Sequence, residues 1–371
     1  MKKLLFGLIL GGLGWVTISA FNETKSTLTD GFLIGDPEIA SITSLSFGPE
    51  GILFIGDSKN ATIYALDTED ADPKDESAEI NLGDFDTKIA ASLGRTKDQI
   101  KVTDMAVNPV SKTVYFSVNL VDGTPVLLKL EEEALVNIPL NNIGYSKIAL
   151  SDAVEVNAED KRGRPLRIWA ISDMKYHKGK ILVSGLSNKE FGSTFRSIPF
   201  PFKDTQDYAS LEIYHAAHGQ YETFAPIKTF DVIALENKEY LMASYTCTPL
   251  VLFPMEELKE GKHTKGRTVA ELGSGNSPLD MISFEKEGKP YFLMSNTNRS
   301  VMRIDYTTIA DFKESLTTPV TEFAKATGVG YVSLPMVNVL QLDNLDANKV
   351  VYMQRTSSGE LILRSRSTKW M

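Results

Sequence analysis

The sequence predicts an all-β chain folded as a six-bladed β-propeller. Six segments repeat one strand pattern, short β-rich strands alternate with turns, and no amphipathic helical segment separates them. A parallel βαβ fold needs such helices between its strands. A solenoid also repeats its units, but it needs capping segments at both ends, which the sequence does not show. A closed ring of six blades therefore fits the repeats best.

Each repeat contains a short alternating strand, a turn rich in Gly, Asn, Asp, Pro or Lys, a second β-rich strand, a polar loop and a third strand. The repeats begin at Ile42, Val102, Ile171, Thr229, Pro278 and Pro335. A polar residue near the start of each first strand sets the alignment, and these residues are Ser44, Asp104, Asp173, Asp231, Asp280 and Asn338. Their uneven spacing predicts loops of different length on a repeated sheet.

The two ends of the repeat region predict how the ring closes. The last repeat ends near Arg366 with only three clear strands, and residues 27–35 (TLTDGFLIG) precede the first repeat as a strand without a partner. Closing a ring removes exposed strand edges, which are an aggregation hazard. We therefore expect this N-terminal strand to complete the sixth blade.

Residues 1–20 have the features of a secretory signal peptide. A basic start precedes an apolar run over residues 4–16, and Ala20 ends a small-residue cleavage site. A retained membrane anchor is the alternative, but the apolar run is short for a full span. We expect cleavage after Ala20 and a secreted or periplasmic location. Residues 21–371 then form a single propeller domain that does not span a membrane.

Composition narrows the choice of partners. The formal net charge is −9, and no basic stripe or interleaved basic and aromatic face is present, so nucleic acid is not an expected partner. Cys247 is the only cysteine, so the chain has no internal disulfide. A small molecule, a metal ion or a protein remains as the expected partner.

Unusual polar residues gather on one predicted rim of the channel. In a propeller, the loop that enters each innermost strand lies on the same rim as the loop between the second and third strands. The opposite rim holds plain turns such as residues 285–289. Because binding residues concentrate on loops held by a rigid scaffold, we predict a ligand site on the first rim. Its candidate residues are Arg196, His215, His218, Tyr221, Glu222, Cys247, Asn276, Asn296 and Arg299.

The two histidines of this rim suggest metal chemistry. His215 and His218 lie three residues apart, and with Glu222 or Cys247 they offer imidazole and thiolate ligands for Zn²⁺ or copper. A hydrogen-bonded histidine pair without a metal is the alternative. Cys247 can also be a nucleophile activated by a histidine, or a small buried apolar residue.

A second candidate site is a ring of carboxylates at the mouth of the channel. Four like charges in a narrow space need relief from a cation or from hydrogen bonds. One interpretation is a divalent metal site with oxygen ligands, most typical of Ca²⁺. In the other, each aspartate accepts backbone N–H bonds from the neighbouring blade and holds the ring together. The residues are Asp104, Asp173, Asp231 and Asp280, flanked by Ser44 and Asn338.

Segments such as ITSLSFGPEGILFIGD and ISDMKYHKGKILVSG resemble the blades of NHL-repeat and gluconolactonase-like six-bladed propellers. The resemblance covers most of residues 21–371 at the level of blade pattern. It implies a channel cation held by acidic and amide residues, with Asp231 and Asp280 at positions similar to channel ligands, and hydrolysis of lactones or organophosphates. The first blade carries Ser44 in place of the glutamate of the gluconolactonase-like group, and no Glu-Gly-Pro motif occurs.

Three functions remain open from the sequence. The first is an exported propeller that binds a small molecule, a metal ion or a protein on its loop-rich rim. The second is a metal-dependent hydrolase, similar to lactonases or esterases, with a divalent cation in the channel. The third is a copper-linked redox protein. Propellers host unrelated activities, so the fold does not decide whether the chain is an enzyme.

Overall fold

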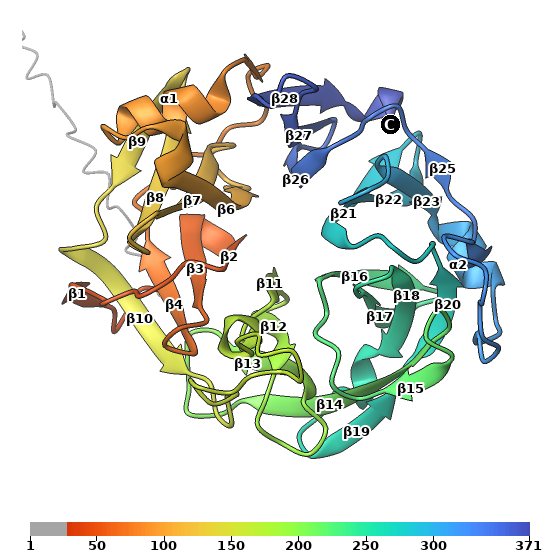
Figure 1. Cartoon of the computed structure of the whole chain (residues 1–371). Coiled ribbons are helices and arrows are strands. Elements are labelled where there is room, and N and C mark those ends of the chain that lie inside the picture. The colour runs from red at the N-terminus through yellow and green to blue at the C-terminus, as the bar shows by residue number, and fades with distance from the viewer. Residues whose placement is uncertain (1–27) are drawn as a thin grey trace, which may run out of the picture.

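Six β-sheets stand around a central axis in the computed structural model, which describes residues 28–371 (Figure 1). This arrangement confirms the six-bladed propeller. The predicted signal peptide lies outside the described residues. Within residues 28–371, no helix is both long and apolar enough to cross a membrane.

Blades one and two come from residues 33–149. Blade one consists of β2 (Ser44–Phe47), β3 (Ile52–Asp57), β4 (Thr62–Asp67), β10 (Ile143–Ala149) and β1 (Leu33–Gly35). Blade two consists of β6 (Ile100–Val107), β7 (Val114–Leu120), β8 (Pro125–Glu131) and β9 (Ala134–Ile138). Every residue of β3 is buried, because neighbouring blades cover both faces of the sheet.

Blades three and four follow in the chain, and blade three has the most strands. Blade three consists of β11 (Asp173–His177), β12 (Lys180–Leu186), β13 (Ser193–Pro199), β14 (Asp207–His215) and β15 (Gln220–Glu222). Blade four consists of β16 (Thr229–Leu235), β17 (Lys238–Ser244), β18 (Pro249–Pro254), β20 (Arg267–Glu271) and β24 (Thr327–Gly328). Strand β19 (Lys262–Lys265) lies in the connection between β18 and β20 of blade four. It pairs in parallel with β14 and so joins this connection to blade three.

Blades five and six complete the ring. Blade five consists of β21 (Pro278–Lys286), β22 (Lys289–Asn296), β23 (Met302–Asp305) and β25 (Val332–Ser333). Blade six consists of β26 (Val339–Asp346), β27 (Lys349–Arg355), β28 (Leu361–Ser367) and β5 (Asn81–Leu82). Within residues 28–371, the two α-helices are short and lie in connections: α1 (Phe85–Ser92) and α2 (Tyr306–Asp311).

A strand from the N-terminal part of the chain completes the sixth blade, as the sequence predicts, but it is β5 rather than residues 27–35. Leu82 of β5 pairs with Leu363 of β28. Residues 33–35 instead form β1, which pairs with β10 at the outer edge of blade one. The connection between blades one and two supplies the closing strand because blade two, not blade one, is the neighbour of blade six.

The blades do not follow one another around the ring in chain order. Innermost strands contact each other in the cycle β2, β6, β26, β21, β16, β11 and back to β2. The chain therefore passes from blade one to blade two in one direction (Figure 1). It then returns through β10, which pairs with β4 of blade one, and builds blades three to six in the opposite direction.

The hydrophobic core is divided among the six contacts between blades. Each neighbouring pair encloses its own cluster of buried residues, such as Phe54 with Val183 between blades one and three, and Phe195 with Phe230 between blades three and four. Because the core surrounds the axis instead of filling it, the innermost strands and the rim loops remain free to carry polar residues.

Candidate metal centre

The turn from β14 to β15 places two histidines face to face. His215 ends β14, and its carbonyl accepts the backbone N–H of His218 at 3.1 Å and of Gly219 at 2.8 Å. Gly219 has φ +65°, a backbone conformation that favours glycine, so this residue lets the chain reverse into β15. The ring centroids of His215 and His218 lie 3.8 Å apart at an interplanar angle of 38°.

Glu222, at the end of β15, holds both histidines. One carboxylate oxygen lies 2.9 Å from Nδ1 of His215, and the other lies 2.6 Å from Nδ1 of His218. Burial raises the pKa of Glu222, but the hydrogen bonds from the two histidines outweigh burial and lower it to about 2. At neutral pH Glu222 is therefore an anion that fixes the position of both rings.

This contact determines which nitrogen of each ring is available. An ionised carboxylate only accepts hydrogen bonds, so each Nδ1 carries the proton that Glu222 receives. In a neutral imidazole the other nitrogen, Nε2, then has a free lone pair. Nε2 of His215 is buried and has no hydrogen-bond partner in the protein. Buried polar atoms are nearly always paired, so this atom indicates a position for a ligand.

Cys247 reaches the same place from blade four. It lies in the turn between β17 and β18, where Cys247 has φ +66° and Thr248 has φ +60°. Two successive non-glycine residues in the left-handed region cost on the order of 1–3 kcal/mol each, and such strain is common at functional sites. Hydrogen bonds hold the turn: Cys247 N–H donates to the Asn276 carbonyl at 2.8 Å, and the Thr248 hydroxyl donates to the Gly273 carbonyl at 3.0 Å.

His215, His218 and Cys247 together form a set of possible metal ligands. One ligand atom from each residue lies within 4.8 Å of the other two. His215 is buried, with 2% of its side chain exposed, whereas 43% of the His218 side chain is exposed, so solvent reaches the set from the His218 side. Within residues 28–371, this is the one candidate metal-binding group of three or more His, Cys, Asp or Glu residues.

Glu271 lies beneath the histidine turn. It ends β20 with its side chain fully buried, and one carboxyl oxygen accepts the backbone N–H of Ala217 at 3.1 Å. The other oxygen has no partner in the protein. Burial and the nearby Glu222 raise the pKa of Glu271 to about 7. The sequence analysis missed this residue, since a glutamate in a strand with no motif around it gives no signal.

The other predicted rim residues lie apart from this set or have structural contacts. The Asn276 amide donates to Asn296 at 3.0 Å, and its side-chain oxygen accepts from Asn298 N–H, so these residues shape the loops beside Cys247. Arg299 donates to the carbonyl of Ala324 at 3.0 Å. Tyr221 is half exposed and packs against Tyr214.

Arg196 lies inside blade three and not on the rim surface. Its side chain is fully buried, and its guanidinium donates to the Ser151 carbonyl at 2.8 Å and to the Thr194 hydroxyl at 3.3 Å. Tyr208 faces the guanidinium at 5.4 Å. Arg196 therefore attaches the segment that crosses from blade one to blade three.

The channel aspartates join neighbouring blades. One oxygen of Asp104, Asp173 and Asp280 accepts the N–H of the residue that follows, and the other accepts an N–H from the next blade, at 2.7–2.9 Å. Asp231 differs, because it accepts from Lys175 and from the Ser283 hydroxyl. These hydrogen bonds give the ring of aspartates a structural role, and the channel cation stays a prediction.

Two residues that the sequence alignment did not select complete this ring. Asp343 accepts Val107 N–H of blade two at 2.7 Å, and the Ser46 hydroxyl accepts Tyr176 N–H of blade three at 3.0 Å. The predicted flanking residues, Ser44 and Asn338, make no such bond between blades. In blade six the residue that makes this bond is Asp343, inside β26, and not Asn338, which precedes the strand.

The channel itself is narrow and acidic. A cavity of about 240 Å³ is lined by Lys175 and by the aspartates Asp104, Asp173, Asp280 and Asp343. Burial raises the pKa of Asp104 to about 8 and that of Asp173 to about 7. With its amide nitrogen turned toward the carboxylates, Gln341 donates to Asp104 at 3.0 Å and to Asp280 at 3.1 Å. Hydrogen bonds to the carboxylates and their protonation therefore reduce the repulsion between the aspartates of the channel.

Comparisons with known proteins identify no family. No protein-family model matches the chain, and no curated protein matches it. Among solved structures, a chain of the mitotic checkpoint complex is 10% identical, with 98% of each chain covered and a TM-score of 0.33. Drosophila Plexin A in complex with Semaphorin 1b is 11% identical, with 90% of this chain and 86% of that chain covered and a TM-score of 0.37.

A third solved structure, YCF48 bound to D1 peptide, is 10% identical, with 89% of this chain and 81% of that chain covered and a TM-score of 0.35. The chain is thus a six-bladed β-propeller, a fold that commonly serves as a binding scaffold. The six-bladed fold implied by the resemblance to NHL-repeat and gluconolactonase-like propellers is confirmed, and no specific family is identified.

Proposed function

We propose that this protein binds a transition-metal ion on the rim between blades three and four, through Nε2 of His215, Nε2 of His218 and Sγ of Cys247. The observation that carries the proposal is that one ligand atom from each of the three residues lies within 4.8 Å of the other two, with the buried Nε2 of His215 left without a partner. The shared contact with Glu222 supports it, because histidines that bind metals usually donate their other N–H to a carboxylate.

The ligand types favour zinc or copper over calcium. Imidazole nitrogen and thiolate sulfur suit Zn²⁺ and copper, whereas Ca²⁺ takes six to eight oxygen ligands. Three protein ligands leave a coordination position open on a tetrahedral ion, and the exposed side of His218 gives solvent access to it. A bound ion would also contribute the contacts that offset the backbone strain at Cys247.

Equilibrium dialysis of the purified protein with Zn²⁺ tests this proposal. We expect one tightly bound ion per chain, and loss of that binding in the Cys247→Ser and His218→Ala variants. The matched control is His263→Ala, since His263 also contacts a carboxylate, Glu212 at 3.2 Å, but has no cysteine or second histidine beside it. Because the ligands must be deprotonated, affinity should fall as the pH is lowered. Equal binding by the wild type and Cys247→Ser would overturn the proposal.

A further inference from the structure

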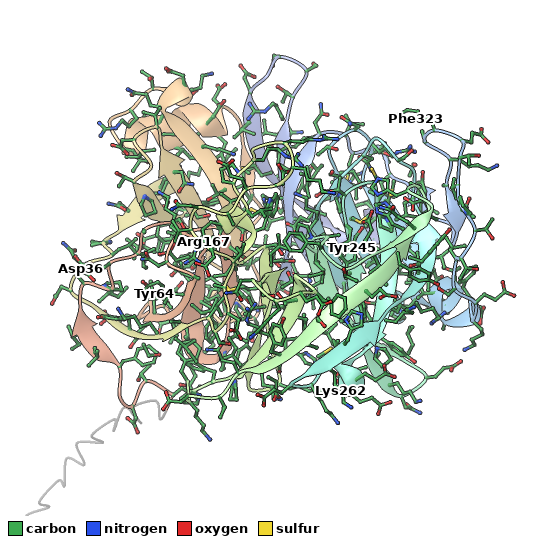
Figure 2. All side chains as sticks on the ribbon, turned by 60° about the horizontal axis from the view of Figure 1, so that its bottom comes forward. Asp36, Tyr64, Arg167, Tyr245, Lys262 and Phe323 are labelled. Atoms are coloured by element: carbon green, nitrogen blue, oxygen red, sulfur yellow. The ribbon has the colours of Figure 1, made fainter. Side chains whose placement is uncertain are left out.

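A long connection between blades five and four contacts the histidine turn of the candidate metal centre and the loop beside Cys247. Residues 313–328, here called the strap, leave α2 and follow β20 along the outer side of blade four. Leu316 N–H donates to the Thr268 carbonyl at 2.8 Å, and Thr327 of β24 pairs with Glu271. Figure 2 shows Phe323 of the strap at the edge of the molecule, and 79% of this residue is exposed.

The middle of the strap holds the histidine turn. Val320 N–H donates to the carbonyl of Ala216, which lies between the two histidines, at 2.8 Å. Pro319 packs against Gly219, where an added Cβ would lie only 3.2 Å from the proline ring. The strap therefore covers the outer side of the turn that positions His215 and His218.

The end of the strap holds the loop beside Cys247. Ala324 N–H donates to the Ser274 hydroxyl at 3.0 Å, and Phe323 packs against Gly275. In the same loop, the carbonyl of Asn276 accepts Cys247 N–H at 2.8 Å. The strap thus contacts the histidine turn directly and reaches the cysteine turn through the loop that contains Ser274 and Asn276.

Building on the proposed function, we infer that the strap is a clamp whose docking is coupled to metal binding at His215, His218 and Cys247. A bound ion fixes the distance between the histidine turn and the cysteine turn. The strap holds the histidine turn through Val320 and, through Ala324, the loop that supports the cysteine turn, so each event favours the other. Coupling of this kind is reciprocal: the factor by which metal stabilises the docked strap equals the factor by which strap docking strengthens metal binding.

Hydrogen exchange on the wild-type protein tests the clamp directly. With Zn²⁺ bound, we expect the Val320 and Ala324 amides to exchange at least about fivefold more slowly than in the metal-free protein. The amide of Leu316, which binds Thr268 far along the strap, serves as an internal reference. Unchanged exchange at Val320 and Ala324 in a protein that binds Zn²⁺ would refute the clamp and leave the metal proposal intact. Absence of Zn²⁺ binding would overturn both.

A matched pair of serine variants gives the reciprocal test. Ser274→Ala removes the acceptor of Ala324 N–H, and Ser315→Ala removes the acceptor of Thr268 N–H at 3.2 Å, at the other end of the strap. We expect Ser274→Ala to weaken Zn²⁺ binding about fivefold or more and Ser315→Ala to leave it unchanged, while the metal-free variants have similar free energies of unfolding. Equal Zn²⁺ affinities in the two variants would contradict the clamp.

Discussion

The pKa values of two carboxylates, Glu222 and Asp104, shift in opposite directions because their surroundings differ. Glu222 receives hydrogen bonds from two histidines, which hold its pKa at about 2 despite burial. Asp104 lies in the channel near other carboxylates, and burial raises its pKa to about 8. Glu222 is therefore the anion that orients the candidate metal ligands, and protonation of Asp104 lowers the negative charge of the channel.

The raised pKa of Asp104 predicts a pH dependence of stability. The folded state binds this proton more tightly than the unfolded chain, whose aspartates titrate near about pH 4. The stabilisation is therefore complete below about pH 4 and is lost as the pH rises through about 8. In metal-free protein, wild type should lose about 1–3 kcal/mol more stability than Asp104→Asn between about pH 5.5 and pH 8. Chemical denaturation at the two pH values measures this, and the same loss in both proteins would contradict it.

Sequence patterns identify the ligand types but not every partner. The HxxH spacing, Glu222 and the only cysteine are visible in the sequence, and the structure brings them together at one rim. Glu271 and Asp343 cannot be recognised from the sequence. Glu271 accepts a hydrogen bond from a turn of blade three, and Asp343 accepts one from β6 of blade two. Arg196 was predicted on the rim because it follows a polar loop, but it lies within β13 and points into the blade.

At the scale of single elements, the short strand β5 closes the propeller. It spans only two residues, yet Leu82 is buried with Phe85 of α1 and Leu363 of blade six. The sequence predicts closure by a strand from the N-terminal part of the chain, since the last repeat lacks its fourth strand. It does not indicate β5, because a two-residue strand has no periodicity to recognise.

Two substitutions of similar chemistry distinguish the closing strand from the edge strand. Leu82→Ala should destabilise the protein by about 2–5 kcal/mol, because it leaves a cavity between blades two and six. Ile34→Ala in β1 should change stability by no more than about 0.5 kcal/mol, because Ile34 is 78% exposed. Urea denaturation followed by circular dichroism measures both. A larger effect at Ile34 than at Leu82 would mean that β1 closes the ring.

At the scale of the whole molecule, the order of blades around the ring differs from their order in the chain. Six repeats are apparent from strand patterns, but which blades are neighbours depends on which apolar faces fit together. Blade one packs on blade three through Phe54 and Val183, and on blade two through Tyr64 and Tyr115. The candidate metal centre lies between blades three and four, whose shared cluster of buried side chains gives the two turns a rigid base. Tyr245 at the start of the cysteine turn belongs to that cluster (Figure 2).

X-ray absorption of the Zn²⁺-loaded protein tests the central claim most directly, because it measures the ligand atoms themselves. The three residues predict one sulfur at about 2.3 Å and two imidazole nitrogens at about 2.0–2.1 Å from the ion. The sulfur signal should disappear in Cys247→Ser, while His263→Ala should give the wild-type spectrum. A spectrum fitted by oxygen ligands alone would place the ion elsewhere, among the carboxylates, and would contradict a centre built from His215, His218 and Cys247.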